Sequence, residues 1–175
     1  ALDANITGPS NTAVGTSALT ANTTAGNNTA LGKSAGAATT TGSENTFIGS
    51  LSGDVNTTGA NNTSLGYIAL STASEADNNT AVGHAALYLN TTGADNTAVG
   101  KSALAAATTA SGNTAVGIDA GNTITTGTYN VAIGFNAQPT AVDSAGQFTM
   151  GDTNITNLRC NVQTISSLSD SRDKT

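Results

Sequence analysis

Aliphatic residues recur in this sequence at a fixed spacing of 17 residues, each inside a five-residue phrase that begins with Asn and ends with Gly. The first copy reads Asn-Thr-Ala-Val-Gly at residues 11–15, and the last reads Gln-Phe-Thr-Met-Gly at 147–151. The phrase starts nine times without an insertion, at Asn11, Asn28, Asn45, Asn62, Asn79, Asn96, Asn113, Asn130 and Gln147. An unbroken period of this kind predicts a solenoid whose coils stack in register.

We number the repeat from zero at the Asn. Position three is aliphatic in every copy, which predicts an inward core ladder on a short strand. Its members are Val14, Leu31, Ile48, Leu65, Val82, Val99, Val116, Ile133 and Met150. Side chains alternate along a strand, so position one is expected to share the inward face. It is Thr in seven copies and then Val131 and Phe148, which suits a narrow interior.

Position two is small in most copies, and position four is Gly in all nine. This pattern predicts a face that lies against neighbouring chains or a tightly packed backbone, formed by Ala13, Ala30, Ala81, Ala98 and Ala115. The Gly serves either this close approach or a positive φ at a corner, and the sequence leaves both interpretations open.

Positions seven and eight are a second apolar site, as in Ala18-Leu19, and predict a second strand. Gly36, Gly53 and Gly121 replace the Leu in other coils, so that strand is only partly filled. Thr-Thr-Gly at 40–42, 57–59, 91–93 and 125–127 marks the return turn, and we expect the stacked Asn and Thr columns to hydrogen-bond from coil to coil. Because each coil has a thin core, we also expect an oligomer.

Composition excludes several classes of function. Charged residues make up 9% of the chain, aromatic residues 3%, and the net charge is −6 without a Lys/Arg cluster, which argues against a nucleic-acid partner. A lone Cys160 and a single His84 indicate neither redox chemistry nor a metal site, and no cofactor is expected. No apolar run is long enough for a membrane helix, so membrane insertion is not expected.

Enzymatic activity is not expected in this chain either. A glycoside hydrolase would need paired carboxylates at a suitable separation. The acidic residues are scattered over turns without a repeated pairing: Glu44, Asp54, Glu75, Asp77, Asp95 and Asp119. The chain begins at Ala1 rather than Met and has no signal peptide, so we expect it to be a piece of a longer protein.

Position five, just after the Gly, varies freely along the chain, which predicts an outward column available for recognition. Its members are Thr16, Lys33, Ser50, Tyr67, His84, Lys101, Ile118, Phe135 and Asp152. The candidate binding residues are Lys33, Tyr67, His84, Lys101 and Phe135. The alternative is a solvated corner under no constraint.

After Gly151 the period is lost, and Ile155, Leu158, Val162 and Ile165 follow at spacings of three, four and three. This spacing suits a short coiled coil, but Asn, Thr and Val form helices poorly, so an intertwined β neck is an equal alternative. The chain thus divides into a lead-in at 1–10 from a preceding segment, repeats at 11–151, a neck at 152–168 and a tail at 169–175.

The repeat, best seen as Asn-Val-Ala-Ile-Gly at 130–134, resembles the phrase in the head domains of trimeric autotransporter adhesins and in bacteriophage tail fibres. This resemblance implies a β-roll assembled as a homotrimer. The predicted fold is therefore an all-β solenoid of about nine 17-residue coils within a homotrimeric fibre.

The tail, Ser-Asp-Ser-Arg-Asp-Lys at 169–174, is similar to the start of the intramolecular-chaperone autoprotease domain of phage tail fibres and tailspikes. That family's Ser-Asp-x-Arg-x-Lys string implies cleavage between Ser169 and Asp170, with Ser169 as nucleophile and Lys174 as its base. A desolvated lysine can serve such a dyad. Because the rest of the domain would follow Thr175, the dyad is expected to be inert here; a chance match in a polar tail is the alternative.

Three functions are compatible with these patterns. The first is a structural and host-attachment segment of a phage tail fibre in the virion, which binds a host-cell receptor or glycan and is matured by loss of its chaperone. The second is the head of a trimeric adhesin on a bacterial surface. The third is an ice-binding solenoid, for which two outward Thr columns one residue apart are typical, whereas the adjacent Thr pairs here should point to opposite sides.

Overall fold

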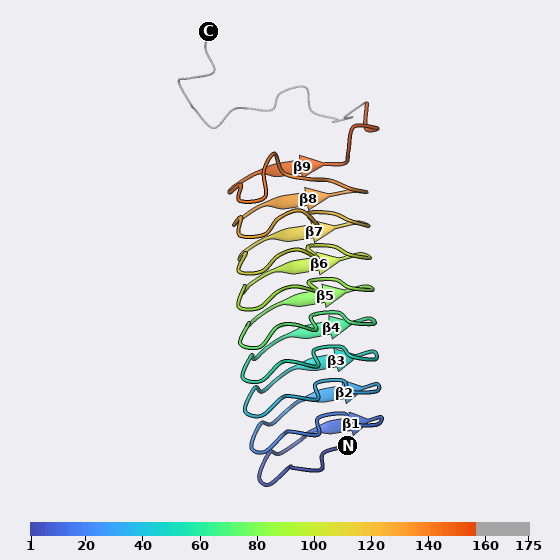
Figure 1. Ribbon diagram of the computed structural model, residues 1–175, viewed down its shortest axis with the longest axis vertical. Coiled ribbons are helices and arrows are strands. Elements are labelled where there is room, and N and C mark those ends of the chain that lie inside the picture. The colour runs from blue at the N-terminus through green and yellow to red at the C-terminus, as the bar shows by residue number, and fades with distance from the viewer. Residues whose placement is uncertain (157–175) are drawn as a thin grey trace.

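The computed structural model describes residues 1–156. It is a rod of stacked coils with one short strand per coil, and the strands lie above one another along its length (Figure 1). They form a single parallel sheet in chain order: β1 (Thr12–Val14), β2 (Thr29–Leu31), β3 (Thr46–Ile48), β4 (Thr63–Leu65), β5 (Thr80–Val82), β6 (Thr97–Val99), β7 (Thr114–Val116), β8 (Val131–Ile133) and β9 (Phe148–Met150). The described residues contain no helix, and the predicted all-β solenoid is confirmed.

The strands pair in perfect repeat register. Thr12 of β1 lies opposite Thr29 of β2, and the same offset of 17 residues holds through Met150 of β9. Each repeat position therefore becomes a column along the rod, with steps of about 4.8 Å, the usual distance between paired strands.

The structure reverses the predicted faces of the strand. Position two points into the coil: Ala98 has 0% of its surface exposed, whereas its neighbour Val99 has 36% exposed. The predicted inward ladder at positions one and three faces outward, with Val14 at 56% and Leu31 at 48%. The coil is narrow, so a small residue stands at position two wherever the other wall supplies a large side chain.

The core instead comes mainly from the return segment. Leu19, Leu70, Leu87 and Leu104 at position eight are fully buried and pack with the Ala columns. This segment has no strand among the described residues; it is a chain of turns, so the expected second strand is wrong. The backbone at position eight is left-handed in both kinds of coil, with φ 51° at Leu87 and φ 57° at Gly53. Gly adopts this conformation readily, so it can replace Leu at this position without a change in the path of the chain.

Phe47 fills the space left by two missing Leu side chains. It occupies position two of β3 and is fully buried. A Cβ atom added to Gly36 would lie 2.6 Å from Cδ2 of Phe47, and one added to Gly53 would meet the other edge of the same ring. One large side chain on the strand therefore compensates for two glycines on the opposite wall.

The Gly at position four has both of the roles left open by the sequence. Gly32 has φ 145°, outside the range favoured by other residues. A Cβ atom on Gly32 would also lie 2.5 Å from the carbonyl oxygen of Gly49 in the next coil. Any side chain here would separate adjacent coils.

A ladder of Asn side chains at position zero, from Asn11 to Asn130, closes each of these coils and joins it to the next. In Asn96, Nδ2 donates to the carbonyl of Ala110 at 2.8 Å, which ties the strand to the return turn of its own coil. Its Oδ1 accepts the backbone N–H of Asn113 in the next coil at 3.0 Å. The expected Thr ladder also exists: Thr91 Oγ1, for example, donates to the carbonyl of Thr108 at 3.0 Å.

The lead-in at residues 1–10 follows the path of a coil. The N–H of Leu2 donates to the carbonyl of Ala18 at 3.0 Å, as Leu19 does to Ala35 one coil later. The Asn5 side chain donates to Gly8, as Asn56 does to Gly59. The repeat geometry thus begins before its first recognisable phrase.

We predict that Asn96→Ala lowers the free energy of unfolding by about 3 kcal/mol, because it leaves the Ala110 carbonyl and the Asn113 N–H buried without partners. Urea denaturation followed by circular dichroism at fixed chain concentration measures the change. The exposed Thr92→Ala is the control and should change stability by less than about 0.5 kcal/mol. Equal effects of the two substitutions would contradict the importance of the ladder.

We also predict that Phe47→Ala lowers stability by about 3–5 kcal/mol, since it empties the space between Gly36 and Gly53. Gly53→Leu alone should be destabilising as well, because the ring occupies the place of the new side chain. In the double variant the Leu fills that space and should recover about 1–2 kcal/mol relative to Phe47→Ala. Additive losses in the same urea experiment would show that the two positions do not share space.

Candidate functional site

The outward face of the sheet is a long uncharged surface. Positions one and three of all nine strands carry only Thr, aliphatic residues and, in β9, Phe148. Aliphatic side chains on it remain substantially exposed, including Leu65 at 45%, Val116 at 40% and Met150 at 47%. A continuous apolar strip along a whole rod is unusual for a chain that stays alone in water. We call positions one and three of β1–β9 the strand face.

The sequence shows that the two faces of each strand differ, but the alternation of side chains alone does not tell which face is outside. One face of each strand carries small residues and the other carries large ones. In a globular domain the large residues would be inside, but in a narrow solenoid the small ones must be. The correct assignment needed the width of the coil, which is set by the Leu residues of the opposite wall.

Position five forms a second surface, beside the strand face but not on it. The Gly at position four bends the chain directly after each strand, so the next side chain leaves the sheet plane. Tyr67 has 51% of its surface exposed, Ile118 48% and Phe135 60%, and Lys33, His84 and Lys101 are also exposed. The predicted outward column is confirmed as a structural feature, whereas its binding role stays a prediction.

The column is held rigidly by the backbone. The carbonyl of Tyr67 accepts the N–H of Ala85 at 3.0 Å, that of His84 accepts Ser102 at 2.9 Å, and that of Lys101 accepts Asp119 at 2.9 Å. The rings of Tyr67 and His84 are in contact, with centroids 5.6 Å apart and planes inclined at 38°. Tyr67, His84 and Lys101 therefore lie on three successive coils, and the rings of the first two pack together.

The five candidate binding residues do not form one cluster. Tyr67, His84 and Lys101 are contiguous, and Phe135 follows after Ile118. Lys33 stands apart, since Ser50 separates it from Tyr67 and Thr16 precedes it. The predicted cleavage residues, Ser169 and Lys174, lie outside the described residues, as does most of the predicted neck.

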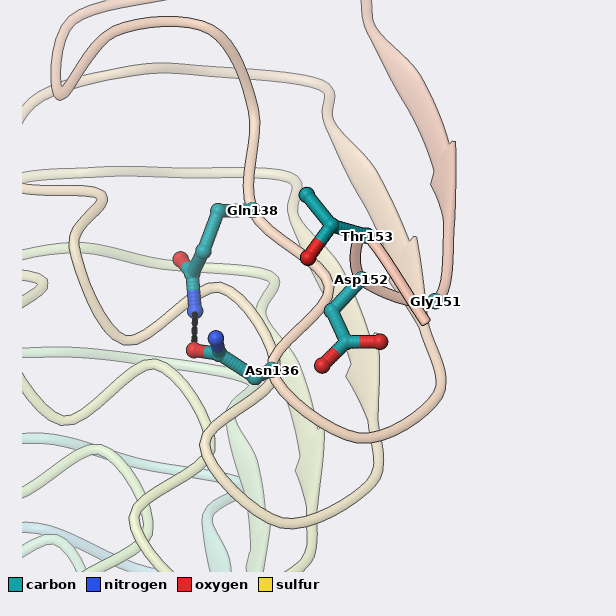
Figure 2. A pocket seen from close by; sticks show the side chains of 5 residues that line it. All are labelled: Asn136, Gln138, Gly151, Asp152 and Thr153. Atoms are coloured by element: carbon teal, nitrogen blue, oxygen red, sulfur yellow. Dashed lines mark hydrogen bonds between the residues drawn. The ribbon is translucent and has the colours of Figure 1, made fainter. Parts of the chain in front are cut away.

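A hollow of about 390 Å³ lies at the end of the rod, lined by Asn136, Gln138, Gly151, Asp152 and Thr153 (Figure 2). Its polar groups are mostly engaged. The Gln138 amide nitrogen donates to the carbonyl of Asp119 at 2.6 Å and to the Asn136 side chain at 3.2 Å. The Asp152 carboxylate accepts two bonds from Asn154. These contacts hold the last coil together and leave few groups to bind a ligand.

Asp54 is a partly buried acidic residue that stands apart in its column. Burial raises the pKa of the Asp54 carboxyl, an effect that a backbone hydrogen bond partly offsets. Its neighbours in the same column are Ala37 and Ser71, so no second carboxylate lies above or below it. Among residues 1–156 no group of three His, Cys, Asp or Glu side chains could hold a metal ion. No helix in that part of the chain is long and apolar enough to cross a membrane.

Comparison with protein-family models, curated proteins and solved structures found no match to this chain.

Proposed function

We propose that this chain is a structural and host-attachment segment of a phage tail fibre, assembled as a homotrimer through the strand face. The observation that supports it best is the uncharged strip of nine aliphatic side chains along the whole rod. An obligate interface resembles a domain core cut in half, and this strip offers large apolar side chains that the narrow interior of one coil has no room to bury.

The geometry of the strand face suits parallel chains. Its columns run along the rod axis, because the strands pair without any shift in register. Rotation about an axis parallel to the rods therefore brings identical columns together and closes the assembly. The number three comes from the resemblance of the repeat to trimeric adhesin heads and tail fibres. The corresponding adhesin head on a bacterial surface remains the alternative, and the Ser-Asp-x-Arg-x-Lys tail favours the virion.

Ice binding is a second candidate function, because the strand face itself has outward Thr and aliphatic columns one residue apart, as in Thr97 and Val99. Thr91 Oγ1 donates to the next coil, and Thr91 and Thr92 are both exposed in the return turn. Side chains at position three range in size from Val to Leu and Met, so the strand face is not flat. Such an uneven surface fits another protein chain better than the flat surface of an ice crystal. A face buried in a trimer is also closed to ice.

We predict that light scattering gives three times the 17.0 kDa of one chain, and that Val99→Lys combined with Val116→Lys yields monomers. The charges would be buried against identical columns of the other protomers. The control combines Val55→Lys and Leu89→Lys, which are 44% and 42% exposed but lie on the return segment, and it should remain trimeric. Ala98→Lys, in contrast, should unfold the coil, since Ala98 is inside it.

A stable, folded monomer of the unsubstituted chain would contradict the trimer. Thermal hysteresis of that monomer, lost in the Val99→Lys and Val116→Lys variant, would then favour ice binding.

We further predict that the full-length precursor is cut between Ser169 and Asp170, so that Ser169 ends the mature chain. Ser169→Ala and Lys174→Ala should each abolish cleavage, because one removes the nucleophile and the other its base. Intact-mass analysis of the precursor measures this. Ser171→Ala, in the same tail, is the control and should be cut normally. Normal processing of both dyad variants would show that the tail is an ordinary polar end.

A further inference from the structure

We propose that Tyr67, His84 and Lys101 form a binding site for a linear glycan that carries carboxylate groups. The proposal deepens the attachment function above and rests on it. We call these three residues the ring–lysine group. It lies where three successive coils, stacked about 4.8 Å apart, carry a phenol ring, an imidazole and an ammonium group.

The distribution of positive charge is the first argument. The whole chain has a net charge of −6. The basic side chains of residues 1–156 are Lys33, His84 and Lys101, and all three stand in the position-five column. Within residues 1–156, neither lysine forms a salt bridge. An uncompensated ammonium group in an otherwise acidic chain is a local site for an anionic group.

The rings supply the second argument. A sugar ring has a flat face of C–H groups that packs on the face of an aromatic side chain, and Tyr67 is half exposed at its ring. Contact with His84 restricts the Tyr67 ring, so less side-chain freedom is lost when a ligand binds. The imidazole also offers a donor and an acceptor for sugar hydroxyl groups.

The column form of the group favours a linear polymer. Positions in a register-locked solenoid repeat in a straight line, so a ligand that contacts Tyr67 can continue along the rod to Lys101. Ile118 and Phe135 extend the column with apolar surface, whereas Asp152 ends it with a negative charge. A carboxylated chain should therefore centre on Tyr67–Lys101 and stop short of Asp152.

The test is isothermal titration of the assembled chain with three carboxylated probes: oligogalacturonate, oligosialic acid and hyaluronan oligosaccharides. Neutral oligogalactan of matched length is the reference. We expect at least one acidic probe to bind, and Tyr67→Ala and Lys101→Ala each to weaken that binding by about tenfold, equivalent to 1.4 kcal/mol. The neutral reference should bind at least about tenfold more weakly than that probe.

Two matched controls make the result specific. Lys33→Ala removes the same residue type from the same column, but away from the rings, and should leave affinity within about twofold. Tyr129→Ala removes a tyrosine that is 74% exposed but lies over Gly112 in the return turn, and should likewise have no effect.

Each contrary outcome overturns the proposal. If none of the acidic probes binds, carboxylated glycans are excluded as the ligand class. If Lys33→Ala and Lys101→Ala weaken binding equally, the binding is only a general attraction of the chain for polyanions. If neutral oligogalactan binds as tightly as the acidic probe, the carboxylate groups do not contribute to binding. Light scattering on every variant separates these results from a failure of assembly, because the trimer depends on the strand face and not on this column.

Discussion

The whole architecture depends on one side chain per coil, the Asn that stands at position zero from Asn11 to Asn130. A solenoid coil has too little apolar volume to fix its own shape, and its turns leave backbone groups that must be paired. Each Asn solves both problems with one amide: Nδ2 of Asn62 bonds the return turn at Ala76, and its Oδ1 accepts the N–H of Asn79 in the next coil. Aspartate would lack the donor and leucine would lack both groups, so the amide is the residue type that both closes a coil and sets the spacing to the next.

The Asn ladder also determines how wide the interior can be. It draws the strand toward the return turn, which leaves room for Leu from one wall and Ala from the other, as with Leu104 and Ala115. The exceptions obey the same volume limit: where Phe47 enters from the strand, Gly36 and Gly53 withdraw on the other wall, and where Gly121 lacks a side chain, Ile124 fills the gap. Large aliphatic residues on the strand then have only the outside available, so the strand face is a consequence of the narrow core.

This explains why the sequence predicted the architecture but reversed its faces. Period, register, strand positions and the Asn and Thr ladders all follow from local patterns that repeat without interruption, and these were predictable. Which side of β6 is inside depends on its distance in space from the opposite wall of the coil, where Leu104 lies. Ala98 and Val99 carry no information about that distance. The contact between the Tyr67 and His84 rings could not be predicted from the sequence either, because it depends on how the two side chains are oriented toward each other.

A register-locked rod separates two tasks by position in the repeat. Columns at positions zero, two and four are restricted by hydrogen bonds, core volume and close backbone approach, so a change there needs a compensating change in the coil, as Phe47 shows. The strand face is constrained only in polarity, which suits contact with identical chains whose columns run in the same direction. Position five follows the bend at Gly100 and its equivalents, outside both sets of constraints, while its backbone carbonyl remains bonded to the next coil. Variation there changes the chemistry of a straight, rigid row without a change in the rod beneath it, which is the property a fibre needs to alter what it attaches to while it keeps its assembly.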